Sequence, residues 1–415
     1  MHILKIGLLL GWRQIQRASL WTTILIVCVM MLTFLNLVAV SGILVGLITG
    51  SERAVQEQFI GDLQITSLPG EDRILHTPEI VSVLDADPLV LARTVQYQAG
   101  GTVEANYRER RDTRAERDLV STRIVGINAA DQDATTGLAK LVVEGEYLDP
   151  DEEGSILIGS LYVERYTENF PDITDSLSDV QPGDQVRVTI NGATKEFTVK
   201  GIVDAKVGDI TSRAYITDRE LRRLSGRLDR NADRISVRTV STADAIRIQE
   251  NLAALGHNDN ARIQTFEEAL PRFIQDIKQT FNVLGTFIGA VGIVVASITI
   301  FIIIFINALS RRRQIGILKG IGIDRRAIEI AYVFQAGIYV LIGSFLGAVV
   351  IYGFLVGYFA NNPIDFPFSD GILVADPIDT LVRFIVLFFV TLAAGFIPAW
   401  MIARQNTLNS ILGRK

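Results

Sequence analysis

The chain of 415 residues has a single cysteine, Cys28, which lies inside an apolar run. One cysteine excludes an intrachain disulfide, so cysteine content does not fix the compartment. The three histidines, His2, His76 and His257, are far apart in sequence and lack ligand spacing, so no metal site is predicted. A large charge of one sign is also missing, because 40 Lys and Arg offset 46 Asp and Glu to a net charge of -6. The charge therefore gives no case for nucleic-acid binding.

Catalytic motifs are missing as well. A phosphate-binding loop needs Gly-x-x-x-x-Gly-Lys-Ser/Thr, and segment 316–322 has neither that order nor a preceding strand. No Ser/His/Asp, Cys/His or paired-carboxylate pattern stands in a recognisable context. The apolar runs carry no series of carboxylates of the kind that proton relays use, which argues against a secondary transporter. We therefore predict that this chain is not an enzyme, has no catalytic residues and binds no cofactor.

What the sequence does contain is long apolar runs. Apolar residues make up 49% of the chain, yet 21% of it is charged, which indicates an apolar part and a soluble part. A helix needs about 20 apolar residues to cross a bilayer. Four stretches meet that length and are predicted to be transmembrane helices: 20–48, 281–309, 327–359 and 378–403. The first is too long for the apolar region of a signal peptide, which has about 7–15 residues.

The short loops give the orientation. Segment 1–19, predicted to be amphipathic, carries Lys5, Arg13 and Arg17 and no acidic residue, and loop 310–326 is rich in Arg and Lys. The connection between the last two apolar runs instead carries three Asp and no Lys or Arg. Because basic loops stay in the cytoplasm, we place both termini, including tail 404–415, inside a cytoplasmic (inner) membrane. Segment 49–275 is then extracytoplasmic.

Segment 49–275 has the patterning of a soluble domain of mixed α and β structure. Its clearest element is a hairpin over 185–203, with Asn191-Gly192 as the turn between alternating strands. Further strands are predicted at 63–67, 121–127, 155–159 and 234–238. Helices are predicted at 78–85, 218–224 and 242–255, the last with Ala245, Ile248, Leu252 and Leu255 on one face. The fold class is therefore a membrane protein of 1+3 helices with a large α/β domain inserted after the first helix.

Apolar residues also recur at helical spacing on both sides of the inserted domain. Phe266, Leu270, Phe273, Ile277 and Phe281 predict an amphipathic helix that continues into the second span, and 51–59 is its counterpart after the first span. Such stalks would transmit motion to the outer domain. The alternative is that they only pack on it.

The loop with the sequence RRRQIGILKGIGIDRRAI, at 311–328, is the most informative stretch. Ile315, Leu318 and Ile321 or Gly322 recur at helical spacing and predict a short helix whose apolar stripe projects away from the membrane. Basic residues alone would follow from topology, but an apolar stripe indicates docking of a cytoplasmic partner.

This loop resembles the coupling helix of FtsX-like permeases, a family that includes MacB-type exporters and LolC/LolE-type lipoprotein-releasing permeases. The family reads approximately R-R-x-E-I-G-I-L-K-A-I-G-A, and Gln314 replaces its Glu. Pro398 to Arg404 also looks like the family's ending, and segments 124–128, 145–148 and 156–159 resemble the lipoprotein-releasing branch most. The resemblance implies that the residues that contact an ATPase are Arg312, Arg313, Gln314, Ile315, Gly316, Leu318, Lys319, Gly322 and Arg325.

The function implied by the resemblance is that of an ABC transporter permease. Its ATPase would be a separate cytoplasmic chain that binds ATP and Mg²⁺, and a second permease copy or homologue would complete a dimer. The expected substrates are lipoproteins, lipids, peptides or hydrophobic drugs on the extracytoplasmic side, and the expected outer partners are membrane lipids and a lipoprotein or adaptor. One alternative is a regulator that couples an ATPase to a cell-wall hydrolase or sensor. A receptor without an ATPase is a third, but it leaves the apolar stripe unexplained.

Two further features are open to more than one interpretation. Small residues at helical spacing allow helices to approach closely, and three such pairs occur in the spans: Gly285 and Gly289, Gly343 and Gly347, Gly353 and Gly357. They indicate tight packing within one chain or across a dimer. The Arg-rich segment 108–117 is interpreted as a solvated loop, with contact to lipid headgroups or an acidic partner as the alternative.

Overall fold

The computed structural model describes residues 2–108, 117–150, 152–167, 175–270, 272–366, 369–371 and 373–404. Contacts divide the chain into two compact units. The helical unit comprises Met1–Gly50, Asp276–Phe366 and Asp370–Lys415, and the sheet unit comprises Ser51–Gln275 with Pro367–Ser369. The Arg-rich stretch of the sequence lies mostly outside the described residues, as does most of the tail.

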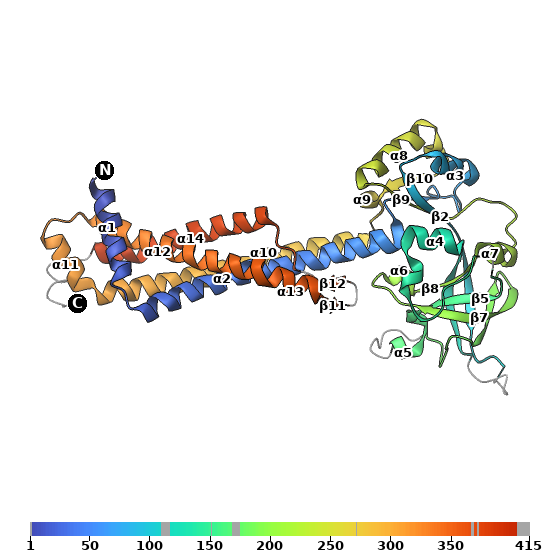
Figure 1. Cartoon of the computed structure of the whole chain (residues 1–415), viewed down its shortest axis with the longest axis horizontal. Helices are drawn as coiled ribbons and strands as arrows, with labels where there is room; N and C mark the ends of the chain where they lie inside the picture. The colour runs from blue at the N-terminus through green and yellow to red at the C-terminus, as the bar shows by residue number, and fades with distance from the viewer. Residues whose placement is uncertain are drawn as a thin grey trace. The chain divides into compact units, whose positions relative to one another are not determined.

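Figure 1 shows the long helices of the helical unit side by side. In chain order the elements that lie mostly in this unit are α1 (His2–Gln16), α2 (Leu20–Val55), α10 (Arg272–Ser310), α11 (Arg312–Gly320), α12 (Arg325–Val350), η5 (Ile351–Leu355), α13 (Val356–Asn361), β11 (Ile364–Phe366), β12 (Ser369–Gly371) and α14 (Pro377–Ala403). Four helical stretches are long and apolar enough to cross a membrane: Leu20–Ile60, Ile274–Ser310, Arg325–Asn361 and Pro377–Met401. The predicted 1+3 arrangement is confirmed.

The core of the helical unit is built from α2, α10, α12 and α14. Phe34 of α2, Ile304 of α10 and Tyr332 of α12 are almost completely buried together, and Ala394 of α14 packs against the same cluster. Helices satisfy every backbone group within the segment, which is what lipid requires of a spanning element. The side chains on the outer faces are apolar as well, as expected for helices in a bilayer.

The sheet unit contains a mixed sheet with helices around it (Figure 1). Its strands are β1 (Leu63–Thr66), β2 (Val90–Glu104), β3 (Leu119–Ile127), β4 (Val142–Gly145), β5 (Ser155–Gly159), β6 (Gln185–Ile190), β7 (Ala193–Val203), β8 (Arg213–Thr217), β9 (Arg234–Thr239) and β10 (Arg262–Thr265). Its helices are η1 (Gln56–Ile60), α3 (Thr77–Ala86), α4 (Ala129–Thr136), η2 (Leu138–Leu141), η3 (Ser160–Tyr162), α5 (Glu164–Thr167), α6 (Gly208–Thr211), α7 (Asp218–Ser225), α8 (Thr242–Ala254), η4 (His257–Asp259) and α9 (Phe266–Ala269). The strand order is β10-β1-β9-β2-β3-β8-β5-β7-β4, and β6 pairs with β2 and β7.

The long strand β2 holds the sheet together. Its first half pairs with β9, and its second half pairs with β3 and β6. The predicted hairpin is confirmed as β6 and β7, and Asn191 and Gly192 have φ of 50° and 82°, the left-handed conformation that such a turn requires.

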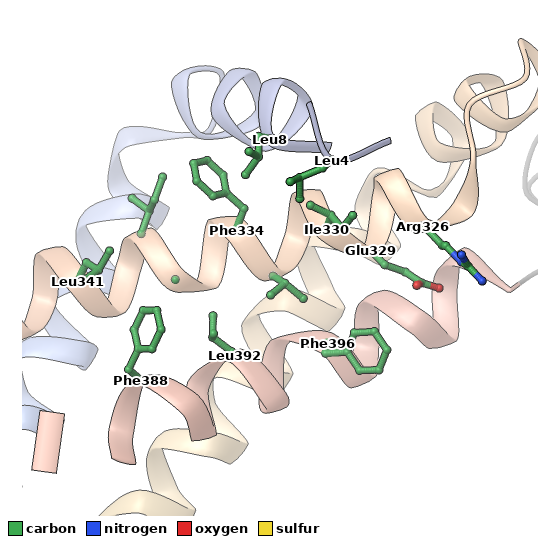
Figure 2. Close-up of a pocket in the computed structure, with 13 residues that line it drawn as sticks. Leu4, Leu8, Arg326, Glu329, Ile330, Phe334, Leu341, Phe388, Leu392 and Phe396 are labelled. Carbon is green, nitrogen blue, oxygen red and sulfur yellow. The ribbon is translucent and has the colours of Figure 1, made fainter. Parts of the chain in front are cut away.

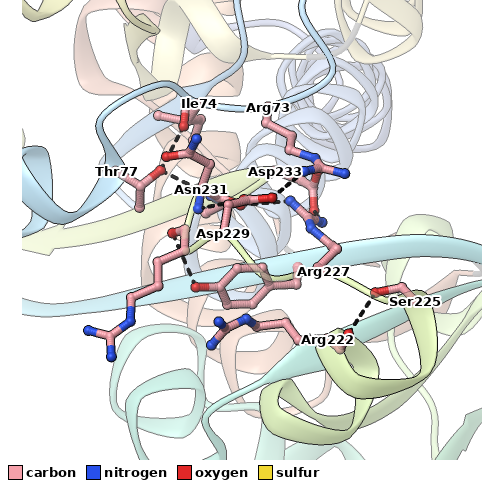
Figure 3. Close-up of polar contacts among 12 residues, drawn as sticks. Arg73, Ile74, Thr77, Arg222, Ser225, Arg227, Asp229, Asn231 and Asp233 are labelled. Carbon is pink, nitrogen blue, oxygen red and sulfur yellow. Dashed lines mark hydrogen bonds and ion pairs between the residues drawn. The ribbon is translucent and has the colours of Figure 1, made fainter.

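Polar contacts fix the loop before β9 on the sheet (Figure 3). The Tyr97 ring of β2 lies near two guanidinium groups, with Arg222 at 5.4 Å and Arg227 at 5.3 Å from its centroid. Arg227 pairs with Asp233 at 2.5 Å, and Arg73 pairs with Asp229. The Tyr97 hydroxyl also donates to the Arg230 carbonyl at 3.4 Å, and the Gln98 N–H donates to Asp233 Oδ2 at 2.6 Å, so backbone and side-chain groups of this loop are tied to β2.

Two local predictions are wrong. The amphipathic helix predicted from Phe266 into the second span is interrupted, because α9 ends at Ala269 and Leu270 is extended with ψ of 125°. The next residue in the sequence is Pro271, which disfavours a helical conformation of the residue before it. On α8, Ala245, Ile248 and Leu252 are buried as predicted, but Leu255 follows the end of the helix and is 56% exposed.

Candidate coupling site

The predicted coupling loop folds into the short helix α11 between two reversals of the chain. Arg311, with φ of -101° and ψ of 11°, separates it from α10. After α11 the chain turns at Gly322, whose φ of 92° favours glycine. Asp324 then caps α12, since its side chain accepts a hydrogen bond from the Arg326 N–H at 2.8 Å. The sequence thus confines α11 to nine residues with defined ends.

One side of α11 packs on the helical unit. Ile315 is only 3% exposed and belongs to the core formed by the four long helices. Gly316 is buried too, and Leu318 is half-buried. Lys319 Nζ donates a hydrogen bond to the Ala403 carbonyl at the end of α14, at 2.8 Å, and burial lowers the pKa of Lys319, aided by the charge of Arg325. The prediction that Ile315 belongs to an outward apolar stripe is therefore wrong.

The opposite side of α11 is open to solvent. Ile317 and Ile321 are 50% and 71% exposed, and Gln314 lies one turn before Ile317. Cations flank them, because Arg313 and Arg325 are exposed. We call Arg313, Gln314 and Ile317 of α11, together with Ile321 just after its end and Arg325 at the start of α12, the α11 surface. The side chain of Arg312 lies outside the described part of the chain.

The sequence pattern thus predicted the right helix and the exposed Ile321, but it placed Ile315 and Leu318 on the same outward stripe. Ile317 was missed as a site residue, although its spacing of four from Ile321 is a helical signal. Gly322, another predicted contact, is exposed at the turn.

The three predicted glycine pairs have different surroundings. An added Cβ at Gly343 would lie 2.4 Å from Met30 Cβ, and one at Gly347 would lie 2.7 Å from Phe34 Cδ1, so this pair brings α12 into close contact with α2. Gly285 and Gly289 make ordinary contacts with α2, at 3.5 and 3.4 Å. The third pair differs, because no described atom lies within 4 Å of a Cβ added at Gly353 or Gly357.

An apolar groove of about 760 Å³ runs between α1, α12 and α14. Figure 2 shows Leu4 and Leu8 of α1 on one side and Phe388, Leu392 and Phe396 of α14 on the other. The charged ends of Arg326 and Glu329 lie toward one end of the groove, close to the start of α12. The rest of the wall is apolar, as expected for a surface that faces lipid chains.

Comparison with protein families assigns both parts of the chain. Residues 286–407 match the model of the FtsX-like permease C-terminal region, and residues 30–255 match that of the MacB-like periplasmic core domain. The chain belongs to the MacB-type FtsX-like permease family. Permeases of this family work with ABC ATPase partners, and they are generally the non-catalytic transmembrane components of their assemblies. Closer kinship of this permease with the lipoprotein-releasing branch stays a prediction.

Several curated relatives of this MacB-type permease are exporters by name. The macrolide export ATP-binding/permease protein MacB of Campylobacter jejuni subsp. jejuni serotype O:23/36 (strain 81-176) is 25% identical over 230 residues, which are 52% of this chain and 34% of the relative. The probable export ATP-binding/permease protein MacB of Pseudomonas entomophila (strain L48) is 25% identical over 187 residues, 44% and 27% of the two chains. The chain thus spans about a third of the length of these relatives.

Two solved structures are similar to part of this MacB-type permease. The extracellular domain of the noncanonic ABC-type transporter YknZ from Gram-positive bacteria has 15% identity and a TM-score of 0.34, covering 49% of this chain and 98% of that one. The periplasmic region of MacB from Actinobacillus actinomycetemcomitans has 18% identity and a TM-score of 0.34, covering 54% and 94%.

Proposed function

We propose that this permease is driven by a separate ABC ATPase that docks on the α11 surface from the cytoplasm. The observation that carries the proposal is the exposure of Ile317 and Ile321 between arginines on a helix whose other side is fixed in the core. Exposed apolar residues ringed by polar ones are typical of a protein interface. Because Ile315 ties α11 to the four long helices, a displacement of α11 would be passed to them.

The other parts of the assembly follow from the same account. ATP and Mg²⁺ would bind to the ATPase partner, and this chain would supply the moving element. A second copy of the permease, or a homologue, would occupy the membrane face that the open pair Gly353 and Gly357 presents. Membrane lipids would fill the apolar groove beside α1.

We further propose that the motion extrudes or releases amphipathic molecules on the extracytoplasmic side. The substrate classes are lipoproteins, lipids, peptides and hydrophobic drugs, with a lipoprotein or adaptor as an outer partner. Support comes from the relatives whose names include macrolide export, and from the sheet unit, whose size provides a surface for substrates outside the membrane.

The proposal is tested by asking whether an ATPase co-purifies with the full chain. An affinity-tagged chain is expressed in its native host and purified in mild detergent, and Mg²⁺-dependent ATP hydrolysis that vanadate inhibits is measured in the eluate. We expect activity to elute with the chain in a fixed ratio. A monodisperse preparation that retains no such activity, even after mild crosslinking of the membranes, would contradict the proposal.

A further inference from the structure

One face of the sheet carries two arginines on neighbouring strands. Gly100 of β2 pairs with Arg123 of β3, and Arg123 pairs in parallel register with Arg213 of β8. Neighbouring strands lie about 4.8 Å apart, so the two like charges start from adjacent backbone positions and repel each other. No described atom lies within 4 Å of a Cβ added at Gly100, so the space beside Arg123 is open.

A cavity of about 720 Å³ lies over this row of residues. Its volume is in the range of small-molecule sites. Thr102, Ser121 and Ser212 line it with hydroxyl groups, and among the described residues these hydroxyls make no hydrogen bond. Donors from three strands and a connecting loop therefore converge on one space.

The charges around the cavity do not balance. Arg213, whose side chain is 3% exposed, donates to Asp209 Oδ1 at 2.9 Å, and Asp209 is the one acidic residue among the described residues that line the cavity. The guanidinium of Arg123 has no hydrogen bond or ion pair within the described part of the chain.

A third arginine adds to the excess of positive charge. Arg234 lies 4.3 Å from the centroid of the Phe59 ring, and Arg213 lies 4.8 Å from the same centroid. Burial and the charge of Arg213 lower the pKa of Arg234. Asp209 is thus close to three guanidinium groups, of which Arg123 and Arg213 line the cavity, so the site has a net positive charge that suits an anionic ligand.

We propose that this cavity binds a phosphate monoester, with Arg123 and Arg213 as charged donors and the three hydroxyl groups as neutral donors. A phosphate monoester carries about -1.5 to -2 charges at pH 7 and three strong acceptor oxygens, so it offers negative charge to the two lining arginines and acceptors to the hydroxyl groups. Arginine binds such groups through paired N–H donors. The ester is either a soluble molecule or a lipid headgroup. The proposed binding of this ligand does not depend on the docking of an ATPase on the α11 surface.

The experiment uses the full chain in a neutral detergent and a phosphate-free buffer, with binding measured by calorimetry. Inorganic phosphate and glycerol 3-phosphate represent soluble ligands, and short-chain phosphatidic acid represents a headgroup. The variants are Arg123→Gln, which removes one charged donor, and Gly100→Val, which fills the open space and suits a strand. Arg262→Gln, at an exposed position of β10, is the matched control.

We expect saturable binding of at least one probe to the wild type and to Arg262→Gln with the same affinity. Arg123→Gln and Gly100→Val should each weaken it by about tenfold or more, because a charged hydrogen bond is lost or the ligand is excluded. Stronger binding of phosphatidic acid than of glycerol 3-phosphate would identify a lipid source, and the reverse a soluble one. No binding of any probe, or equal losses in Arg123→Gln and Arg262→Gln, would overturn the proposal.

Discussion

Replacement of Gly343 by leucine is expected to lower the yield and the melting temperature of the folded chain. A side chain at this position of α12 would meet Met30 Cβ at 2.4 Å, the backbone nitrogen of Met31 at 3.0 Å and the Val27 carbonyl at 3.1 Å. Backbone atoms of α2 cannot move aside as a flexible side chain would, so the two helices must separate. Overpacking of a core costs about 1–3 kcal/mol and sometimes more, and this case should reach the upper end.

The measurement is the yield and melting temperature of the chain in detergent, followed by fluorescence-detected size exclusion. For unfolding of the helical unit alone, whose size lies in the range of about 150–250 residues, a loss of about 3 kcal/mol corresponds to a melting temperature lower by roughly 6–12 °C. Gly353→Leu is the matched control, because no described atom lies within 4 Å of the added Cβ. If both variants lowered the yield and the melting temperature equally, the effect of leucine would not come from the contact between α2 and α12.

The double substitution Ile317→Asp and Ile321→Asp is expected to abolish ATPase binding while the permease stays folded. Both side chains are largely exposed, so carboxylates there remain hydrated in the free permease. In the complex they would be buried against the partner. A central apolar residue in an interface contributes about 2 kcal/mol or more, so two losses together weaken binding by at least several hundred-fold.

The position of Ile315 provides the contrast. Ile315→Asp places a carboxylate in the core at a site that is 3% exposed, and an unpaired buried charge is strongly destabilising. This variant should lower the melting temperature of the permease as well as ATPase retention. A different result would contradict this assignment. If the Ile315→Asp permease kept the wild-type melting temperature but no longer bound the ATPase, Ile315 would lie on the side of α11 that contacts the ATPase.

The sequence predicted the parts of the fold that depend on local patterns. The four spans follow from their apolar length, and the hairpin at Asn191 and Gly192 follows from turn chemistry. Strand β2 was not predicted, because Thr94 and Gln96 are buried on the face that α4 covers and hydrogen-bond Gln132, each at 2.9 Å, where alternation would place apolar residues. When polar side chains are buried against residues that are distant in sequence, the strand shows no alternation of apolar and polar residues.

The site was predicted in part, for a related reason. Helix α11 is short and carries isoleucines on both sides, so periodicity identifies a helix but not which side the rest of the chain covers. Only the packing of Ile315 against the long helices decides this. The juxtaposition of Arg123 and Arg213 was likewise beyond local patterns, because it arises from the parallel register of β3 and β8.

The central claim is that a cytoplasmic ATPase contacts the α11 surface, and site-specific crosslinking tests it most directly. In a Cys28→Ser background, a photoactivatable thiol probe is attached to Ile321→Cys or, as a control, to Leu228→Cys, which replaces a 96% exposed residue of the sheet unit. Irradiation of native membranes should crosslink the probe at position 321 to a second protein that contains an ATP-binding motif. The probe at position 228 should not crosslink to that protein. Absence of that crosslink from position 321 in folded, fully labelled protein would contradict the account.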